Sequence, residues 1–253
     1  MLRGVLGPDE VDELRRDVER VFDEYPPDIR RPESEFVAWD EFRYETVNRS
    51  AVVQRVVGHR DILDVIEPLV GEDCHLIANS SWRNPAGREA THGGGKWHID
   101  AGPHVPRPVG TQWPEEIPYP VFVVAAHILI DPMPLSCGPT GVIPRSHTSG
   151  QAPPSDRLDD VDLDYDGVGV LPLGGEAGDV ALFVSDVWHR RLPPDPGGPG
   201  RFFVQAHYGR RDIAQRLHTT DTTNQASAQA IARAGTTRER TLIGLHPALF
   251  YDG

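Results

Sequence analysis

The hydrophobic pattern of this chain changes period after residue 72. Before that point, apolar residues recur at helical spacing in two segments, 8–22 and 51–70. Beyond it, the apolar residues form short runs bounded by Gly and Pro, and four of these runs have the length and composition of strands: 75–82, 121–130, 180–184 and 201–208. The sequence therefore predicts N-terminal helices followed by a β core. The 25 Gly and 24 Pro favour a fold with many turns over a helical bundle.

The predicted class is mainly β with flanking α-helices, in one domain of 253 residues. β-Sandwiches and barrels of this length commonly form a single domain. We expect residues 1–72 to supply N-terminal helical support, 73–210 to form the β core, and 211–253 to form a C-terminal helical segment.

Charge and composition exclude several classes of partner. The formal net charge is −13, whereas nucleic-acid binders usually present a clustered basic face. No stretch approaches the roughly 18 consecutive apolar residues of a membrane span, and residues 1–4 lead into a polar segment without a signal-peptide core. Cys74 and Cys137 form neither a disulfide framework nor a CxxC pair. We expect a cytoplasmic monomer or homodimer that acts on a small molecule and binds neither nucleic acid nor membrane.

A histidine and a carboxylate two residues apart, His98 and Asp100, give the first indication of chemistry. In an extended segment their side chains project to the same side. His189 lies at the end of an apolar run that follows the Gly178-Asp179 turn, which places it at the end of a predicted strand. Two histidines and one carboxylate can hold one face of an Fe(II) ion. Taken alone, however, His-x-Asp is more often a hydrogen-bonded surface pair, and His189 could equally be a core or helix-capping histidine.

Three blocks of sequence resemble the phytanoyl-CoA dioxygenase family. They are Trp97-His98-Ile99-Asp100, then Asp131 followed by Cys137 to His147, then Gly178-Asp179-Val180 to Trp188-His189 with Arg201 after it. Members of this family are Fe(II)- and 2-oxoglutarate-dependent oxygenases with a double-stranded β-helix (jelly-roll, cupin-like) core. This chain departs from the family pattern at Arg145, where Gly is usual, and at Cys137, where Asn is common. Both departures affect a turn and leave the three candidate ligands intact.

The resemblance implies a role for each residue of the candidate site. His98, Asp100 and His189 would be the catalytic Fe(II) ligands, with 2-oxoglutarate and O2 as co-substrates. Arg201 would bind the distal carboxylate of 2-oxoglutarate, a task suited to a planar guanidinium. Related halogenases have a small residue at the carboxylate position, so Asp100 favours hydroxylation, desaturation or another oxidative rearrangement over halogenation, with hydroxylation as the expected outcome. The acidic composition, without an obvious basic cluster for CoA phosphates, favours a small natural-product intermediate as substrate.

Further contacts rest on position along the chain. Asn79, on the strand that precedes the His-x-Asp block, and Thr140, in the second block, could bind the carboxylates of 2-oxoglutarate. Five residues are candidate substrate contacts: Lys96, His104, Trp113, His127 and Gln205. Lys96 could instead be a solvated loop residue, and His127 could be a satisfied core histidine. The segment 101–119 follows the metal ligands directly and is predicted to be a lid.

Two other functions are compatible with the sequence. A cupin-like metalloenzyme that needs no keto acid would use the same metal ligands but would not need Arg201. A catalytically silent binding module of the same fold would need none of the four residues. The presence of His98, Asp100, His189 and Arg201 together argues against the silent module.

Overall fold

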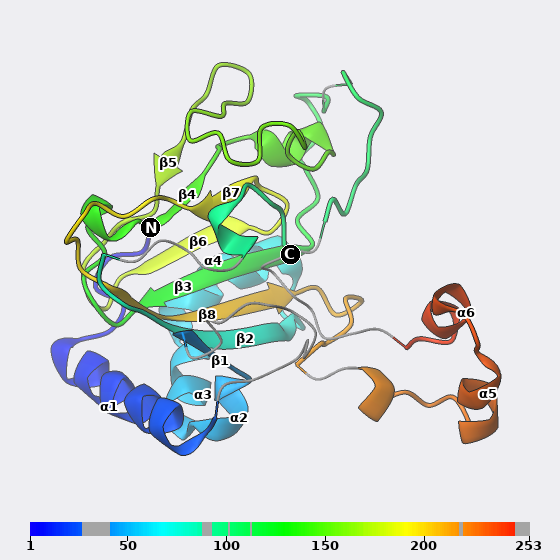
Figure 1. Ribbon diagram of the computed structural model, residues 1–253, viewed down its shortest axis with the longest axis horizontal. Helices are drawn as coiled ribbons and strands as arrows, with labels where there is room; N and C mark the ends of the chain where they lie inside the picture. Colours follow the sequence, from blue (N-terminus) through cyan, green and yellow to red (C-terminus); the bar gives the residue numbers. More distant parts are fainter. Residues whose placement is uncertain (27–40, 88–92, 101, 112, 218–219, 246–253) are drawn as a thin grey trace.

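The computed structural model describes residues 1–26, 41–87, 93–100, 102–111, 113–217 and 220–245 (Figure 1). The helices are α1 (Pro8–Glu24), α2 (Thr46–Arg49), α3 (Ala51–Val57), α4 (Arg60–Val70), α5 (Ala228–Arg233) and α6 (Thr237–Leu242). The strands are β1 (Phe42–Tyr44), β2 (His75–Asn84), β3 (Val123–Leu129), β4 (Thr140–Val142), β5 (Leu171–Pro172), β6 (Val180–Val184), β7 (His189–Arg191) and β8 (Arg201–Gly209).

The strands form two antiparallel sheets. The large sheet has the order β1-β2-β8-β3-β6, and the small sheet has the order β5-β4-β7. An isolated bridge between His98 and His189 adds the His-x-Asp segment to the free side of β7. The side chains between the two sheets include Val142 of β4 and Phe183 of β6, which pack in one buried cluster. The predicted class, mainly β with flanking helices, is confirmed.

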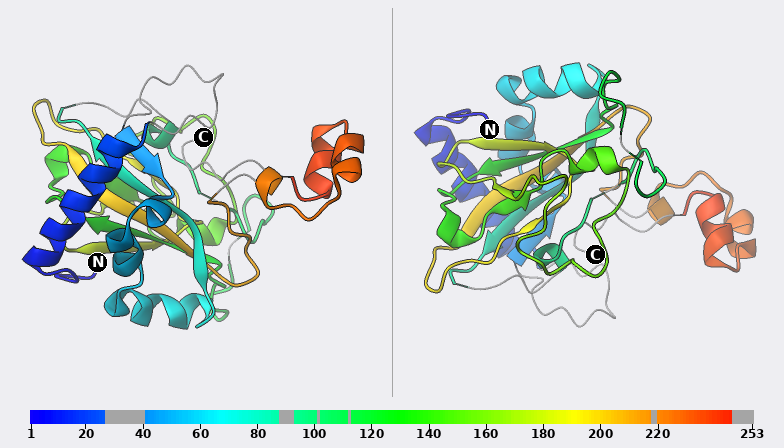
Figure 2. Two further views of the ribbon diagram at one scale, coloured as in Figure 1. Left: turned by 90° about the horizontal axis from the view of Figure 1, so that it is seen from below. Right: turned by 90° about the horizontal axis from the view of Figure 1, so that it is seen from above.

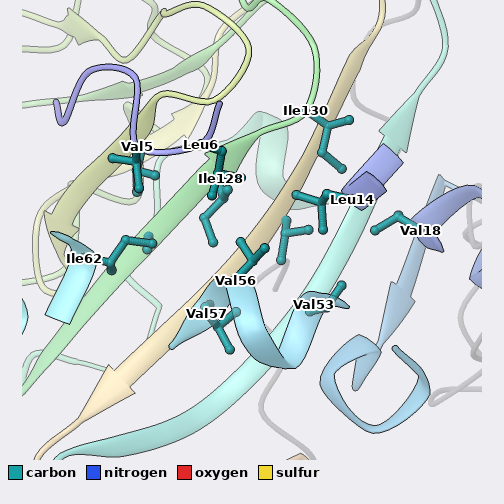
Figure 3. Packing of buried hydrophobic residues seen from close by; sticks show 14 of the residues in the cluster. Val5, Leu6, Leu14, Val18, Val53, Val56, Val57, Ile62, Ile128 and Ile130 are labelled. Carbon is teal, nitrogen blue, oxygen red and sulfur yellow. The ribbon is translucent and has the colours of Figure 1, made fainter. Parts of the chain in front are cut away.

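The helices α1 to α4 cover the outer face of the large sheet (Figure 2). Their apolar residues pack against alternate residues of β3 and β8 in one buried cluster, much of which is seen in Figure 3. Leu14, Val18, Val53 and Ile62 come from the helices, and Ile128 comes from the sheet. No helix among the described residues is long and apolar enough to cross a membrane. The N-terminal helices thus protect one face of the large sheet and leave its other face for the site.

Strand β8 is the central element of the large sheet, with β2 on one side and β3 on the other. Its even-numbered residues, such as Val204 and Ala206, belong to the cluster under the helices. Side chains alternate along a strand, so the odd-numbered residues 201, 203, 205 and 207 point toward the small sheet. Every residue of β8 is buried, and polar residues on the inner face therefore need partners there.

The structure differs from the sequence predictions in the details of several elements. The helix predicted over 51–70 is two helices, α3 and α4, because the chain turns at Gly58 and His59 starts α4 by accepting a hydrogen bond from the Asp61 N–H. His189 opens β7 after a turn and does not end the preceding strand. In the C-terminal segment, α5 and α6 lie away from the sheets, and α5 has no buried residue (Figures 1 and 2). Residues 246–253 of that segment lie outside the described residues.

The turn at Arg145 has a conformation that favours glycine. Arg145 has φ 69° and ψ −10°, and its side chain is exposed. A left-handed conformation costs a residue with a Cβ about 1–2 kcal/mol, and glycine avoids this cost. Glycine also loses more backbone entropy on folding, which offsets roughly 0.5–1 kcal/mol of the gain. We therefore expect Arg145→Gly to raise the free energy of unfolding by about 0.5–1 kcal/mol, measured by chemical denaturation.

A control for this prediction is available on α1. Arg16 is also an exposed arginine, but it lies in the middle of a helix. Arg16→Gly should lower the free energy of unfolding by about 1 kcal/mol. If both variants were destabilised alike, the strain assigned to Arg145 would not exist.

Candidate metal centre

A pocket opens between the two sheets, at the side where the His-x-Asp segment joins β7. Its lining comes from β2, β3, β4, β7 and β8 and from the His-x-Asp segment with the residues just before it: Trp82, Gly94, His98, Asp100, His127, Thr140, His189, Arg190, Arg191, Arg201, Phe203 and Gln205. The structure thus brings together seven of the predicted site residues, which are spread along the sequence from His98 to Gln205.

His98, Asp100 and His189 offer one ligand atom each, and these atoms lie within 4.8 Å of one another. The Asp100 Oδ1 lies 3.3 Å from Nε2 of His189 and 3.7 Å from Nε2 of His98. The arrangement is fixed by the backbone, because His98 and His189 exchange two hydrogen bonds, both 3.0 Å long. Two imidazole nitrogens and a carboxylate oxygen form a donor set suited to a divalent transition metal.

The orientation of both imidazoles favours metal binding through Nε2. Nδ1 of His98 lies 2.7 Å from the carbonyl oxygen of Lys96, and Nδ1 of His189 lies 2.9 Å from that of Val187. A carbonyl can only accept a hydrogen bond, so Nδ1 carries the proton in each ring. In the neutral imidazole this leaves the lone pair on Nε2, the nitrogen that faces Asp100.

Asp100 is the only acidic side chain among the lining residues that the structure describes. Burial acts to raise the pKa of its carboxyl group, but His189 and His207 outweigh this effect and hold the pKa well below its usual range. Asp100 Oδ2 is 2.8 Å from Nε2 of His207. Asp100 Oδ1 is buried and has no hydrogen-bond partner among the described residues. A buried carboxylate oxygen without a hydrogen bond is costly unless something charged binds it, so a metal ion fits this position.

Arg201 lies at the start of β8, in the same pocket. Its Nε and Nη2 both donate to Asn84 Oδ1, at 2.9 and 2.7 Å, and the guanidinium carbon lies 5.3 Å from the ring centre of Phe203. Asn84 in turn donates to Glu41 Oε2 at 2.7 Å. These contacts hold a buried cation in a fixed orientation, as binding of a carboxylate requires.

His127, Thr140 and Gln205 also line this pocket. Thr140 Oγ1 is 3.5 Å from Nδ1 of His127, and Nε2 of His127 is buried without a hydrogen-bond partner among the described residues. Burial, together with the neighbouring His207 and Arg201, holds the pKa of His127 well below its usual range, so the ring is neutral at neutral pH. Because its buried Nε2 has no partner among the described residues, His127 is not a satisfied core histidine.

Gln205 Oε1 accepts hydrogen bonds from Trp82 Nε1 at 2.8 Å and from Ser80 at 3.1 Å.

Asn79 lies on the opposite face of its strand from the pocket. Its side chain accepts hydrogen bonds from Thr46 Oγ1 at 2.8 Å and from the Val47 N–H at 2.7 Å, on the side of α2. Because side chains alternate, Ser80 and Trp82 face the pocket instead. The structure does not place Asn79 where it could contact a ligand in the pocket.

Three other predicted residues lie outside the pocket lining. Lys96 is largely exposed and forms an ion pair with Asp159 at 3.2 Å. His104 Nδ1 is 2.5 Å from Asp186 Oδ1, which ties the start of the predicted lid to the turn before β7. Trp113 donates a hydrogen bond to the Ile117 carbonyl within the same segment. Residues 101 and 112 of this segment lie outside the described residues.

Sequence reasoning missed several residues of the site. His207 is fully buried and contacts Asp100, but it was not selected, although it alternates with Arg201 along the same strand. Arg191 faces the pocket because it pairs in register with Thr140. Trp82 faces Phe203 in register, and their rings stack at 6.2 Å. The signal for His207 was strand alternation, whereas Arg191 and Trp82 required the strand pairing itself.

Comparisons with known proteins agree with this geometry. The sequence profile described as Phytanoyl-CoA dioxygenase (PhyH) matches residues 1–191, which is most of the chain and includes all three candidate metal ligands. The match ends before Arg201. A search of curated proteins found no match.

Solved structures share the fold at low sequence identity. HygX from Streptomyces hygroscopicus, with nickel and 2-oxoglutarate bound, has a TM-score of 0.59 and 16% identity, over 85% of this chain and 82% of its own. The epimerase SnoN from nogalamycin biosynthesis, in complex with Fe3+, alpha ketoglutarate and nogalamycin RO, has a TM-score of 0.58 and 17% identity, over 83% and 77%. AviO1 from Streptomyces viridochromogenes Tue57 has a TM-score of 0.56 and 18% identity, over 83% and 89%. These likenesses confirm the predicted jelly-roll core.

Proposed function

Since the chain belongs to the phytanoyl-CoA dioxygenase family, we propose that it is an Fe(II)- and 2-oxoglutarate-dependent oxygenase that hydroxylates a C–H bond of a small organic substrate. The observation that carries this proposal is the buried Asp100 Oδ1, which has no hydrogen-bond partner among the described residues and lies 3.3 Å and 3.7 Å from the Nε2 atoms of His189 and His98. When bound, Fe(II) with 2-oxoglutarate would activate O2 for oxidation of the substrate, with release of succinate and CO2.

In this proposal, His98, Asp100 and His189 hold the iron on one side. Three protein ligands leave the remaining coordination positions for the co-substrates. The ionised Asp100 balances only one of the two charges of Fe(II). The positive charge that remains would attract an anionic keto acid.

Arg201 would bind the distal carboxylate of 2-oxoglutarate. It is buried in the pocket that holds the triad, and Asn84 orients its guanidinium. His127 is neutral and its Nε2 has no hydrogen-bond partner among the described residues, so it could donate to the same carboxylate without adding charge. Thr140 lies beside it. Together these residues supply the anchor that a chelating keto acid needs.

For the substrate we propose a small natural-product intermediate. The protein has a net charge of −13, which disfavours highly anionic substrates such as nucleic acids and, more weakly, acyl-CoA esters. The structures of HygX and SnoN contain hygromycin B and nogalamycin RO, respectively. Gln205 would be a substrate contact at the pocket. SnoN is an epimerase, so hydroxylation rests here on the family, and Asp100 as third ligand disfavours halogenation.

The proposal is tested by anaerobic titration of the protein with Fe(II) and then with 2-oxoglutarate. Chelation of the keto acid by Fe(II) produces a weak charge-transfer absorption band in the visible range. We expect the band to saturate at one equivalent of each. Iron binding without the band would favour a metalloenzyme of the same fold that needs no keto acid. If the protein bound no iron and gave no band, the proposal would be overturned.

A further inference from the structure

The Asp100 carboxylate has two oxygen atoms in different surroundings. Oδ2 is 2.8 Å from Nε2 of His207, and Oδ1 lies beside His98 and His189 without a hydrogen bond among the described residues. An ionised carboxylate can only accept hydrogen bonds, so His207 Nε2 is the donor. The hydrogen bond therefore distinguishes the two oxygens and leaves Oδ1 for the metal.

His207 is anchored in the middle of the large sheet. It lies in β8, which is hydrogen-bonded on both sides, and it pairs with Ala78 of β2 and with Ala125 of β3. Both neighbours are small, which leaves room for the imidazole between them. The side chain of His207 is 1% exposed, and that of Asp100 is fully buried.

The contact also joins the two sheets at the site. His98 and His189 belong to the side of the small sheet, where their backbones form a bridge. Asp100 extends that segment, and its backbone N–H donates to the Ser185 carbonyl at 3.3 Å. The hydrogen bond to His207 fastens the carboxylate to the large sheet. The orientation of Asp100 is thus determined from both sides.

We infer that His207 is a positioning residue that makes Asp100 a ligand through one oxygen only. This inference rests on the proposed function, because it matters only if the site holds a metal ion with co-substrates. A carboxylate that bound through both oxygens would occupy an additional coordination position. Three protein donor atoms leave three of six positions, two for the keto acid and one for O2, so a second Asp100 oxygen would compete with these co-substrates. His207 therefore keeps a position open without contacting the metal.

The test compares variants at position 207 with Co(II) as the metal probe. His207→Leu removes the donor, and His207→Asn retains an amide on a side chain too short to reach Asp100. Both should bind Co(II) about 10–100-fold more weakly, the usual effect of losing a hydrogen bond to a metal ligand. His207→Gln places an amide N–H near the position of Nε2 and should retain affinity within about threefold.

Two readouts separate positioning from a structural role. The absorption spectrum of bound Co(II) depends on its coordination number, so His207→Leu should change the spectrum, and His207→Gln should restore it. The affinity of the Co(II)-loaded protein for 2-oxoglutarate should fall in His207→Leu and His207→Asn, because the second Asp100 oxygen competes for its position. If His207→Leu does not fold, His207→Asn carries the comparison.

A matched control lies one residue along the same strand. Tyr208 faces the helices, and its hydroxyl donates to the Val57 carbonyl at 2.6 Å. Tyr208→Phe removes a buried hydrogen bond from β8 and should lower the melting temperature without changing the Co(II) affinity or spectrum. Wild-type affinity and spectrum in His207→Asn, or an equal loss in His207→Gln, would overturn the inference. Failure of the wild-type protein to bind metal and 2-oxoglutarate would instead overturn the proposed function.

Discussion

His189→Ala should lose Fe(II) binding at stoichiometric metal, and with it the charge-transfer band. Structural zinc sites with four protein ligands bind their metal with about 10–16 kcal/mol, which is roughly 3 kcal/mol per ligand, and we take the same share for each of the three ligands here. Loss of one ligand then weakens binding by about 100-fold or more. The substitution removes the Nε2 that lies 3.3 Å from Asp100 Oδ1, and it leaves the backbone pairing with His98 in place. The measurement is metal content after gel filtration, together with a Co(II) binding isotherm.

The control for this variant is a histidine on another strand end. His75 lies on β2, and its Nε2 contacts the Ile213 carbonyl at 2.9 Å, away from the pocket lining. His75→Ala removes an imidazole and one hydrogen bond, as His189→Ala does, but should leave metal content unchanged. Thermal unfolding of both variants shows whether either has lost its fold. Normal metal content in folded His189→Ala would exclude His189 as a ligand.

The architecture was predictable to the extent that its elements are long. α1 has five buried apolar residues on one face, and β2, β3 and β8 each have at least seven residues, so their periods are visible in the sequence. β1, β4 and β7 have three residues each and β5 has two, which is too short for any period. The small sheet therefore depends on tertiary pairing.

The site was predictable where its residues are close in sequence or belong to a family motif. His98 and Asp100 share a side because they are two residues apart. Strand alternation places His207 on the same face of β8 as Arg201, but its contact with Asp100 depends on how the two sheets pack, which no local pattern shows. The predicted contact of Asn79 with 2-oxoglutarate is wrong for a related reason. Alternation shows which residues share a face of the strand, but it does not show which face lines the pocket. In β2 the register also shifts between Leu76 and Ala78, which local pattern cannot show.

The charges of the pocket explain why metal and co-substrate should bind in sequence. Within the described part of the chain, Asp100 is the one carboxylate that lines the pocket, and Arg190, Arg191 and Arg201 are the arginines that line it. Without an anion, the guanidinium groups repel an approaching cation, and only the ionised Asp100 attracts it. Once Fe(II) is bound, the pocket becomes more positive and a dianionic keto acid binds more readily. Arg201 should therefore affect the keto acid far more than the metal.

Arg201→Gln should raise the dissociation constant of 2-oxoglutarate about 100-fold and leave that of Fe(II) nearly unchanged. Removing one partner of a buried, hydrogen-bonded charge pair costs about 2–5 kcal/mol, and each 1.4 kcal/mol corresponds to about tenfold in affinity. Asn84 orients the guanidinium through two hydrogen bonds. Arg201→Lys should give an intermediate loss of 2-oxoglutarate affinity, because lysine retains the positive charge but lacks the planar guanidinium that donates two parallel hydrogen bonds. The charge-transfer band, titrated with 2-oxoglutarate under anaerobic conditions, measures the effect.

Arg83 provides the matched control for this prediction. It precedes Asn84 on β2 and points to the opposite face, where its guanidinium lies 4.4 Å from the ring centre of Phe22, much as Arg201 lies over Phe203. Arg83→Gln removes the same charge and the same kind of aromatic contact but should not alter 2-oxoglutarate affinity. If Arg201→Gln bound the keto acid as the wild type does, another cation of the pocket would hold its distal carboxylate, and Arg191, which pairs with Thr140, would be the residue to replace next.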